Sequence, residues 1–95
     1  MFSQFEWNEN KAITNIKKHK VSFEEAITVF SDPLGRIFSD ETHSTDEMRE
    51  IIIGHSIKNR LLLVWFTERT NSIRIFSARL ATKKEQQDYE ENVYV

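Results

Sequence analysis

Three histidines and a set of arginines are the side chains of this chain best suited to chemistry. A histidine titrates near neutral pH and can accept or donate a proton, whereas an arginine offers a planar, permanently charged fork to phosphate oxygens. His19, His43 and His55 have no neighbour at ligand spacing, and a catalytic zinc would need about three protein ligands. The sequence has no cysteine, which excludes thiol nucleophiles and thiolate metal sites. We therefore expect chemistry that uses no metal and no cofactor.

Acid/base chemistry with cationic stabilisation is the enzymatic option that remains. Two glycines cannot form a phosphate-binding loop, and no serine lies in a nucleophile-elbow pattern. Cleavage of RNA fits, because the 2′-hydroxyl loses a proton, the 5′-oxygen gains one, and the phosphorane between them needs positive charge. Structural roles compete with this hypothesis, since a histidine at a helix end commonly caps or packs, and surface arginines commonly solubilise.

Three runs rich in β-branched and aromatic residues are expected to form the scaffold that positions these side chains. They are Glu50–Ile57, Leu61–Glu68 and Ile73–Arg79, with polar turn residues between them and a helix opening at Thr82. Such a pattern is typical of an antiparallel meander. The fold class predicted is α+β, with this meander, two N-terminal helices and one C-terminal helix.

The turns decide which side chains share a face of the sheet. We expect a two-residue turn at Lys58-Asn59 and a three-residue turn at 70–72. This register predicts three cross-strand rows: Ile51, Phe66 and Phe76; Ile53, Val64 and Ala78; Arg49, Glu68 and Arg74. It also places Arg69 and Arg79 on one mixed face, whereas a two-residue second turn would place them on opposite faces.

The N-terminal half is expected to pack helices against that sheet. Asn8 is a good N-cap for a helix running to about Lys18, which leaves His19 at the helix end on the edge of its buried stripe. Ser22 to Glu25 reads as a capping box that opens a second helix, and Thr82 to Glu85 as another. The second helix is expected to end at Asp32-Pro33. The remaining elements expected are a short strand within 2–7, a strand at Leu34–Ser39 and a loop at Asp40–Glu47.

Composition indicates one soluble, cytoplasmic domain covering residues 1–95. The chain is 39% hydrophobic and 12% aromatic, with one proline and two glycines, so it is globular rather than disordered. No apolar run approaches the roughly 20 residues of a membrane helix. The net charge of −2 argues against a generic nucleic-acid binder, although residues 49–95 hold eight Lys/Arg against six Asp/Glu.

The order of short motifs resembles the BrnT toxins over nearly the whole chain. The N-terminal motifs are Phe5-Glu6-Trp7-Asn8, Asn15-Ile16-Lys17-Lys18-His19 and Val21-Ser22-Phe23-Glu24-Glu25-Ala26. The C-terminal motifs are Thr67-Glu68-Arg69 and Ile73-Arg74-Ile75-Phe76-Ser77-Ala78-Arg79, followed by Ala81-Thr82-Lys83-Lys84-Glu85. The lysine-histidine corner and the Ser-Ala-Arg strand end are specific in combination.

This resemblance implies a RelE-like fold and a ribonuclease whose cleavage of RNA inhibits translation. It implies a cognate, BrnA-like antitoxin encoded beside the toxin, a dimeric toxin-antitoxin assembly, and contact with DNA through the antitoxin. By the same likeness Lys18, His19, Arg69 and Arg79 are catalytic candidates. Arg49 and Lys83 are candidates for holding the RNA backbone.

Lys20 departs from the family pattern, which usually has glycine after the histidine. Glycine would suit a left-handed helix C-cap, and lysine costs on the order of 1 kcal/mol in that conformation. Either the corner ends differently here or His19 is aimed differently. The alternative function is therefore a catalytically degenerate homologue that acts as a protein-binding module or co-repressor with its antitoxin.

Overall fold

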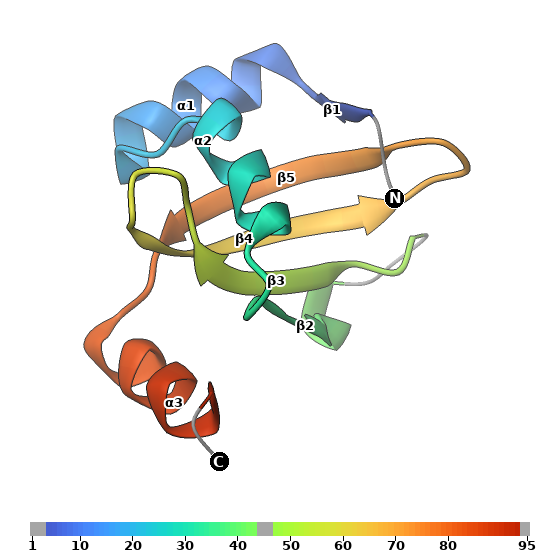
Figure 1. The fold of residues 1–95 in the computed structure, drawn as a ribbon. Coiled ribbons are helices and arrows are strands. Elements are labelled where there is room, and N and C mark those ends of the chain that lie inside the picture. The colour runs from blue at the N-terminus through green and yellow to red at the C-terminus, as the bar shows by residue number, and fades with distance from the viewer. Residues whose placement is uncertain (1–3, 44–46, 94–95) are drawn as a thin grey trace.

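A computed structural model describes residues 4–43 and 47–93 and contains a five-stranded sheet of order β1-β5-β4-β3-β2. Helices α1 and α2 lie on one side of this sheet and α3 on the other (Figure 1). The strands are β1 (Phe5–Trp7), β2 (Arg36–Ser39), β3 (Glu50–His55), β4 (Leu61–Glu68) and β5 (Ile73–Leu80). The α-helices are α1 (Glu9–His19), α2 (Phe23–Ile27) and α3 (Lys83–Val93), and short 3₁₀ helices span Thr28–Ser31 and Glu41–His43.

The sheet is mixed rather than wholly antiparallel. Strands β2 to β5 form the antiparallel part, which confirms the predicted meander, but β1 pairs with β5 in parallel. The fully antiparallel description was therefore wrong at this edge. No hairpin joins β1 to β5, so the local sequence carries no signal for their relative direction. The second N-terminal helix is also shorter than predicted, because its last turn tightens into the 3₁₀ helix at Thr28–Ser31.

The first hairpin turn is longer than predicted. Ser56 and Arg60 pair through a backbone hydrogen bond of 2.9 Å, so the loop holds 57–59, with Asn59 at a φ of 60°. Strand β3 consequently ends at His55. The strand partner of Val64 is Ile52, whereas the predicted partner was Ile53. This shift of one residue moves Ile51 and Ile53 to the α3 side of the sheet.

The second hairpin departs from the predicted register in two ways that cancel. Its turn has two residues, because the amide of Arg69 donates to the carbonyl of Ser72 at 2.8 Å. A bulge then follows, where Trp65 pairs with Ser77 and Phe66 with Ile75, leaving Phe76 as the extra residue. The predicted Val64–Ala78 pair is confirmed, whereas the pairs Phe66–Phe76 and Glu68–Arg74 were wrong.

Each face of the sheet has its own apolar cluster. The main core lies between the sheet and helices α1 and α2, and it is built around Phe23, Leu62, Val64, Phe66 and Ile75. A smaller cluster on the other face is covered by α3, whose Tyr89 is 5% exposed. Helix α3 covers one end of that face and leaves the rest open. Across the described residues, no helix combines the length and apolar character needed to span a membrane.

Side-chain caps begin the three α-helices. Asn8 accepts from the amide of Lys11 at 3.1 Å, as predicted. Thr82 and Glu85 form a complete capping box, with hydrogen bonds of 3.1 and 2.9 Å in the two directions. The box predicted at Ser22 is half right, since Ser22 accepts from the amide of Glu25 but the Glu25 carboxylate turns away.

The corner after α1 keeps the geometry that glycine would give. Lys20 is in the left-handed region, with φ 60° and ψ 32°, and its amide donates to the carbonyl of Ile16 at 2.9 Å. A lysine Cβ is unfavourable there. Lys20 therefore ends the helix in the left-handed C-cap conformation that glycine would favour.

Lys20→Gly is expected to raise the free energy of unfolding by up to about 1 kcal/mol, because glycine relieves the strain of the left-handed conformation. Urea unfolding of the purified chain measures this difference. Asn59→Gly is the matched control, since asparagine tolerates the same region and little gain is expected. A Lys20→Gly protein no more stable than the parent would contradict the strain at this corner.

Candidate functional site

Helix α1 runs beside the outer edge of β5, where β1 has already ended. The Asn15 side-chain amide donates to the carbonyl of Ala78 at 2.8 Å, and the Ala78 amide donates back to Asn15 Oδ1 at 3.1 Å. A buried side chain thus replaces the missing strand partner. Because His19 is one helical turn beyond Asn15, it lies at the end of β5 that carries Arg79.

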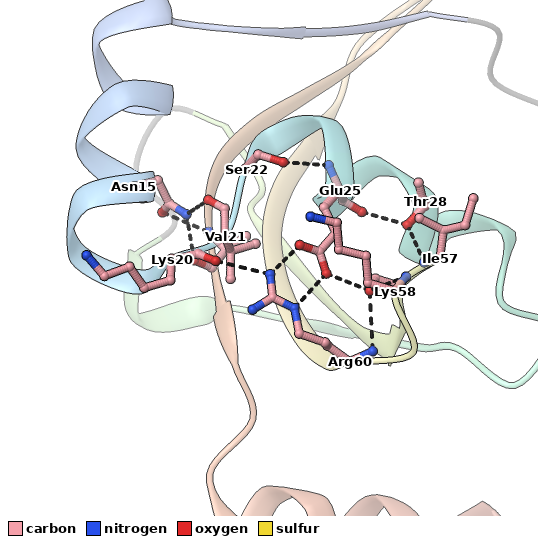
Figure 2. Close-up of polar contacts among 11 residues, drawn as sticks. Asn15, Lys20, Val21, Ser22, Glu25, Thr28, Ile57, Lys58 and Arg60 are labelled. Atoms are coloured by element: carbon pink, nitrogen blue, oxygen red, sulfur yellow. Dashed lines mark hydrogen bonds and ion pairs between the residues drawn. The ribbon is translucent and has the colours of Figure 1, made fainter.

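An ion pair between the buried Glu25 and the half-buried Arg60 holds the corner that follows His19 (Figure 2). Arg60 donates to the Glu25 carboxylate through Nε at 2.9 Å and through Nη2, and the same Nη2 donates to the carbonyl of Lys20 at 3.0 Å. Ser56 completes the carboxylate's partners at 2.6 Å. The Glu25 side chain is 2% exposed, and its hydrogen bond with Arg60 holds the pKa of that carboxyl below its ordinary value despite burial. The β3–β4 loop is thereby attached to the α1–α2 corner.

The open part of the α3-side face contains a shallow cavity with cations around it. This basic groove has a volume of about 280 Å³ and is lined by Lys11, Arg49, Trp65, Phe76 and Ser77. The guanidinium of Arg49 lies 4.0 Å from the centroid of the Phe76 ring, and Lys11 Nζ lies 5.4 Å from it. Aromatic faces orient both cations above the sheet.

Arg79 adjoins the basic groove through Trp65, whose ring centroid is 5.3 Å from the guanidinium carbon. Its two terminal nitrogens donate to the Glu85 carboxylate at 2.7 and 2.9 Å. These hydrogen bonds lower the pKa of Glu85 to about 2 and raise the pKa of Arg79. The Arg79 fork is therefore held in one orientation by the residue that also caps α3.

Arg69 lies at the other end of the same face. It forms ion pairs with Glu6 at 3.3 Å and with Glu47 at 3.1 Å. Arg79 is opposite Leu63, and Arg69 is six residues further along β4, which corresponds to roughly 20 Å. The predicted shared face is therefore present, but it does not bring the two arginines to one phosphate. The bulge returns both to one face, but strand length separates them.

Of the other predicted site residues, one lines the basic groove and three lie outside its lining. Arg49 lines the basic groove, as described above. Lys18 and Lys83 are exposed at the last turn of α1 and the first turn of α3, and His19 is half-buried. Across residues 4–43 and 47–93, the His19 ring makes no hydrogen bond or ion pair. Among the same residues, no three histidine, aspartate or glutamate side chains gather as a metal site would require.

Sequence reasoning missed most of the groove lining. Lys11 is seven residues before Lys18, so the two lie on one stripe of α1, and this spacing could have indicated a shared role. Phe76 was predicted to lie in a row with Ile51 and Phe66, but its ring, like that of Trp65, is partly exposed beneath a cation. The position of Phe76 depends on the bulge, which leaves it as the extra residue of β5. No sequence signal pointed to Glu85 as the partner of Arg79.

The geometry defines a small α+β protein with a cation-lined groove on one face of its sheet. The family model described as "Ribonuclease toxin, BrnT, of type II toxin-antitoxin system" matches residues 7–85. This chain therefore belongs to the BrnT family of ribonuclease toxins. Among solved structures it is similar to the ribonuclease toxin BrnT of Brucella abortus, with a TM-score of 0.65 and 22% identity over 85% of this chain and 100% of that chain. A likeness at this identity shows the fold. A search of curated proteins gave no significant match.

Proposed function

We propose that this chain is a metal-independent RNA endonuclease that inhibits translation in the cytoplasm and is neutralised by a cognate antitoxin. The observation that carries the proposal is the basic groove with Arg79 beside it, at the end of β5 where α1 places His19. Membership of a ribonuclease toxin family supplies the expectation that the bound phosphodiester belongs to RNA.

In the proposed mechanism, the scissile phosphate binds at Arg79. The RNA 2′-oxygen attacks phosphorus as its proton passes to a base, and the bond from phosphorus to the 5′-oxygen breaks as that oxygen gains a proton. His19 performs one of these proton transfers. Arg79 stabilises the negative charge that grows on the phosphorane. The products are a 2′,3′-cyclic phosphate and a free 5′-hydroxyl.

The remaining cations hold the strand on either side of the reacting phosphate. Lys11 and Arg49 lie in the groove, and Lys18 and Lys83 are exposed near its Arg79 end. Arg69 is too distant to touch the same phosphate, so its role is limited to the RNA backbone further along. RNA must also displace the Glu85 carboxylate from Arg79, because this carboxylate accepts hydrogen bonds from both terminal nitrogens of the arginine.

Incubation of the purified chain with RNA in EDTA tests this function. Fragments ending in a 2′,3′-cyclic phosphate are expected from the parent and absent with His19→Gln. His55→Gln is the matched control, because His55 is 45% exposed and belongs to the β3 end rather than to the groove. Intact RNA with tight antitoxin binding would support the degenerate co-repressor instead.

Partners follow from the same proposal. A dimeric assembly with a BrnA-like antitoxin is expected, in which the antitoxin makes the contacts with DNA. The chain's own net charge of −2 supports this division, since a protein that bound DNA directly would usually be basic.

A further inference from the structure

Strand β2 is an exposed edge of the sheet. All four of its residues are exposed, and the exposed fractions of Ile37 and Phe38 are 52% and 47%. Proteins usually protect such edges with charge, proline or a covering element, because an edge strand can pair with another chain. Two neighbouring apolar side chains on an edge strand are therefore unusual for a surface with no partner.

The outward backbone groups of this edge can be identified from its pairing with β3. The Asp40 amide donates to the carbonyl of Arg49 at 2.9 Å, so 36, 38 and 40 point their amides and carbonyls toward β3. The alternation then leaves Ile37 and Ser39 with both groups pointing outward. An extended peptide would find two donors and two acceptors there.

An apolar cleft lies on each side of this edge. On the core side, a cavity of about 550 Å³ is lined by Ile27, Phe30, Ile37, Ile52 and Phe66. On the α3 side, a cavity of about 340 Å³ is lined by Phe38, Ile53, Leu63 and Tyr89. A strand paired with β2 would point successive side chains to opposite faces, and so into the two clefts in turn. A helix would present its apolar side chains to one face.

We propose that β2 is the docking edge for an extended segment of the cognate antitoxin, which adds a sixth strand to the sheet. Its apolar side chains enter the two clefts, and basic side chains flank them. Backbone hydrogen bonds to Ile37 and Ser39 set the register. This inference rests on the proposed function, because it requires an antitoxin.

The charge around the two clefts favours an antitoxin segment over two other occupants, RNA and a second copy of this chain. Glu68 borders the core-side cleft, and Glu85, Asp88 and Arg36 border the α3-side cleft. Glu85 is paired with Arg79 and Asp88 lies 3.7 Å from Lys84, so the two clefts are apolar with weakly acidic borders. RNA is a polyanion and fits the basic groove, which Lys11 and Arg49 line, better than these apolar clefts. A second copy of β2 would bring the acidic borders of two molecules together, which opposes self-association.

The test uses the full chain with the antitoxin encoded beside it. Phe38→Lys and Ser39→Pro are each expected to raise the Kd of the complex at least about 30-fold, as expected for a central interface residue. Ser39→Pro removes an outward amide while leaving the pairing with β3 intact. Leu34→Lys is the matched control, because Leu34 is 55% exposed but lies before β2 and outside both clefts. In hydrogen exchange, the amides of Ile37 and Ser39 should slow on binding.

Several outcomes would overturn the proposal. One is an unchanged Kd for both β2 variants. Another is amide hydrogen exchange at Ile37 and Ser39 that is as fast in the complex as in the free chain. A third is a homodimer of the free chain that Phe38→Lys dissociates. Circular dichroism and RNA cleavage by the free variants show whether each remains folded. If the parent cleaves RNA and binds the antitoxin while the variants bind equally well, the inference alone fails. If the parent binds no antitoxin, the proposed function fails with it.

Discussion

Arg79→Ala is expected to lower the rate of RNA cleavage by about 10²- to 10³-fold, whereas Arg69→Ala should stay within a few fold of the parent. Arg79 lies beside the basic groove at the His19 end of β5, and its orientation is held by Trp65 and Glu85. Arg69 is bound by acidic partners at the far end of the face. Two arginines that sequence alone treated as equivalent should therefore differ greatly in effect.

Single-turnover cleavage of a short RNA measures both variants, with growth arrest as the cellular measurement. Arg79→Lys is expected to fall between parent and alanine, because an ammonium keeps the charge but loses the bidentate geometry. Glu85→Gln should tighten RNA binding by removing the competing anion, and Glu90→Gln on the same helix controls for net charge. Equal losses from Arg69→Ala and Arg79→Ala would contradict the assignment of the reacting centre to one end.

Arg60→Met is expected to destabilise the fold by about 3–5 kcal/mol near pH 7. The substitution leaves the Glu25 carboxylate buried without its cation, whereas Arg60 itself is 30% exposed and could reach water if Glu25 were removed. Arg60→Met also removes the hydrogen bond to the carbonyl of Lys20, so the His19 corner should loosen. Denaturant unfolding measures the loss.

The loss should depend on pH in a defined direction. In the parent, the pKa of Glu25 is lowered below its ordinary value of 4.5, chiefly by Arg60, so the pair stabilises the fold above about pH 4.5. That contribution disappears as pH falls through the lowered folded pKa. In Arg60→Met, burial favours the neutral carboxylic acid. The difference between parent and variant is therefore largest at neutral pH and narrows in acid.

Lys58→Met is the matched control for Arg60→Met. Lys58 lies in the same loop and is exposed, so its replacement removes the same charge without leaving a buried group unpaired. Its effect should stay within about 0.5 kcal/mol. A difference between parent and Arg60→Met that is small, or that does not narrow below pH 4.5, would show that the pair contributes little to the fold.

Local sequence determined where most elements begin. Asn8, Ser22 and Thr82 accept hydrogen bonds from amides three residues later, and such caps need no distant partner. The bounds of β4 were predicted from its β-branched and aromatic run and match the structure. The family motifs are likewise short and contiguous, so the sequence alone indicated the BrnT family. Helix starts, strand runs and family are all local properties of the chain.

Tertiary structure decided which of these residues meet. The bulge at Phe76 and the longer loop at 57–59 reset the strand register, and neither has a local signal strong enough to predict it. Asn15 binds Ala78, 63 residues away, and so places α1 along β5. Glu25 meets Arg60 rather than its own helix end, because burial made a charged partner more favourable than a second cap bond. Arg69 and Arg79 share a face yet lie roughly 20 Å apart, because Arg69 is six residues beyond Leu63, the strand partner of Arg79. The predicted register already implied this separation, whereas the partners that hold each arginine, Glu6 and Glu47 for one and Glu85 for the other, became evident only in the tertiary structure.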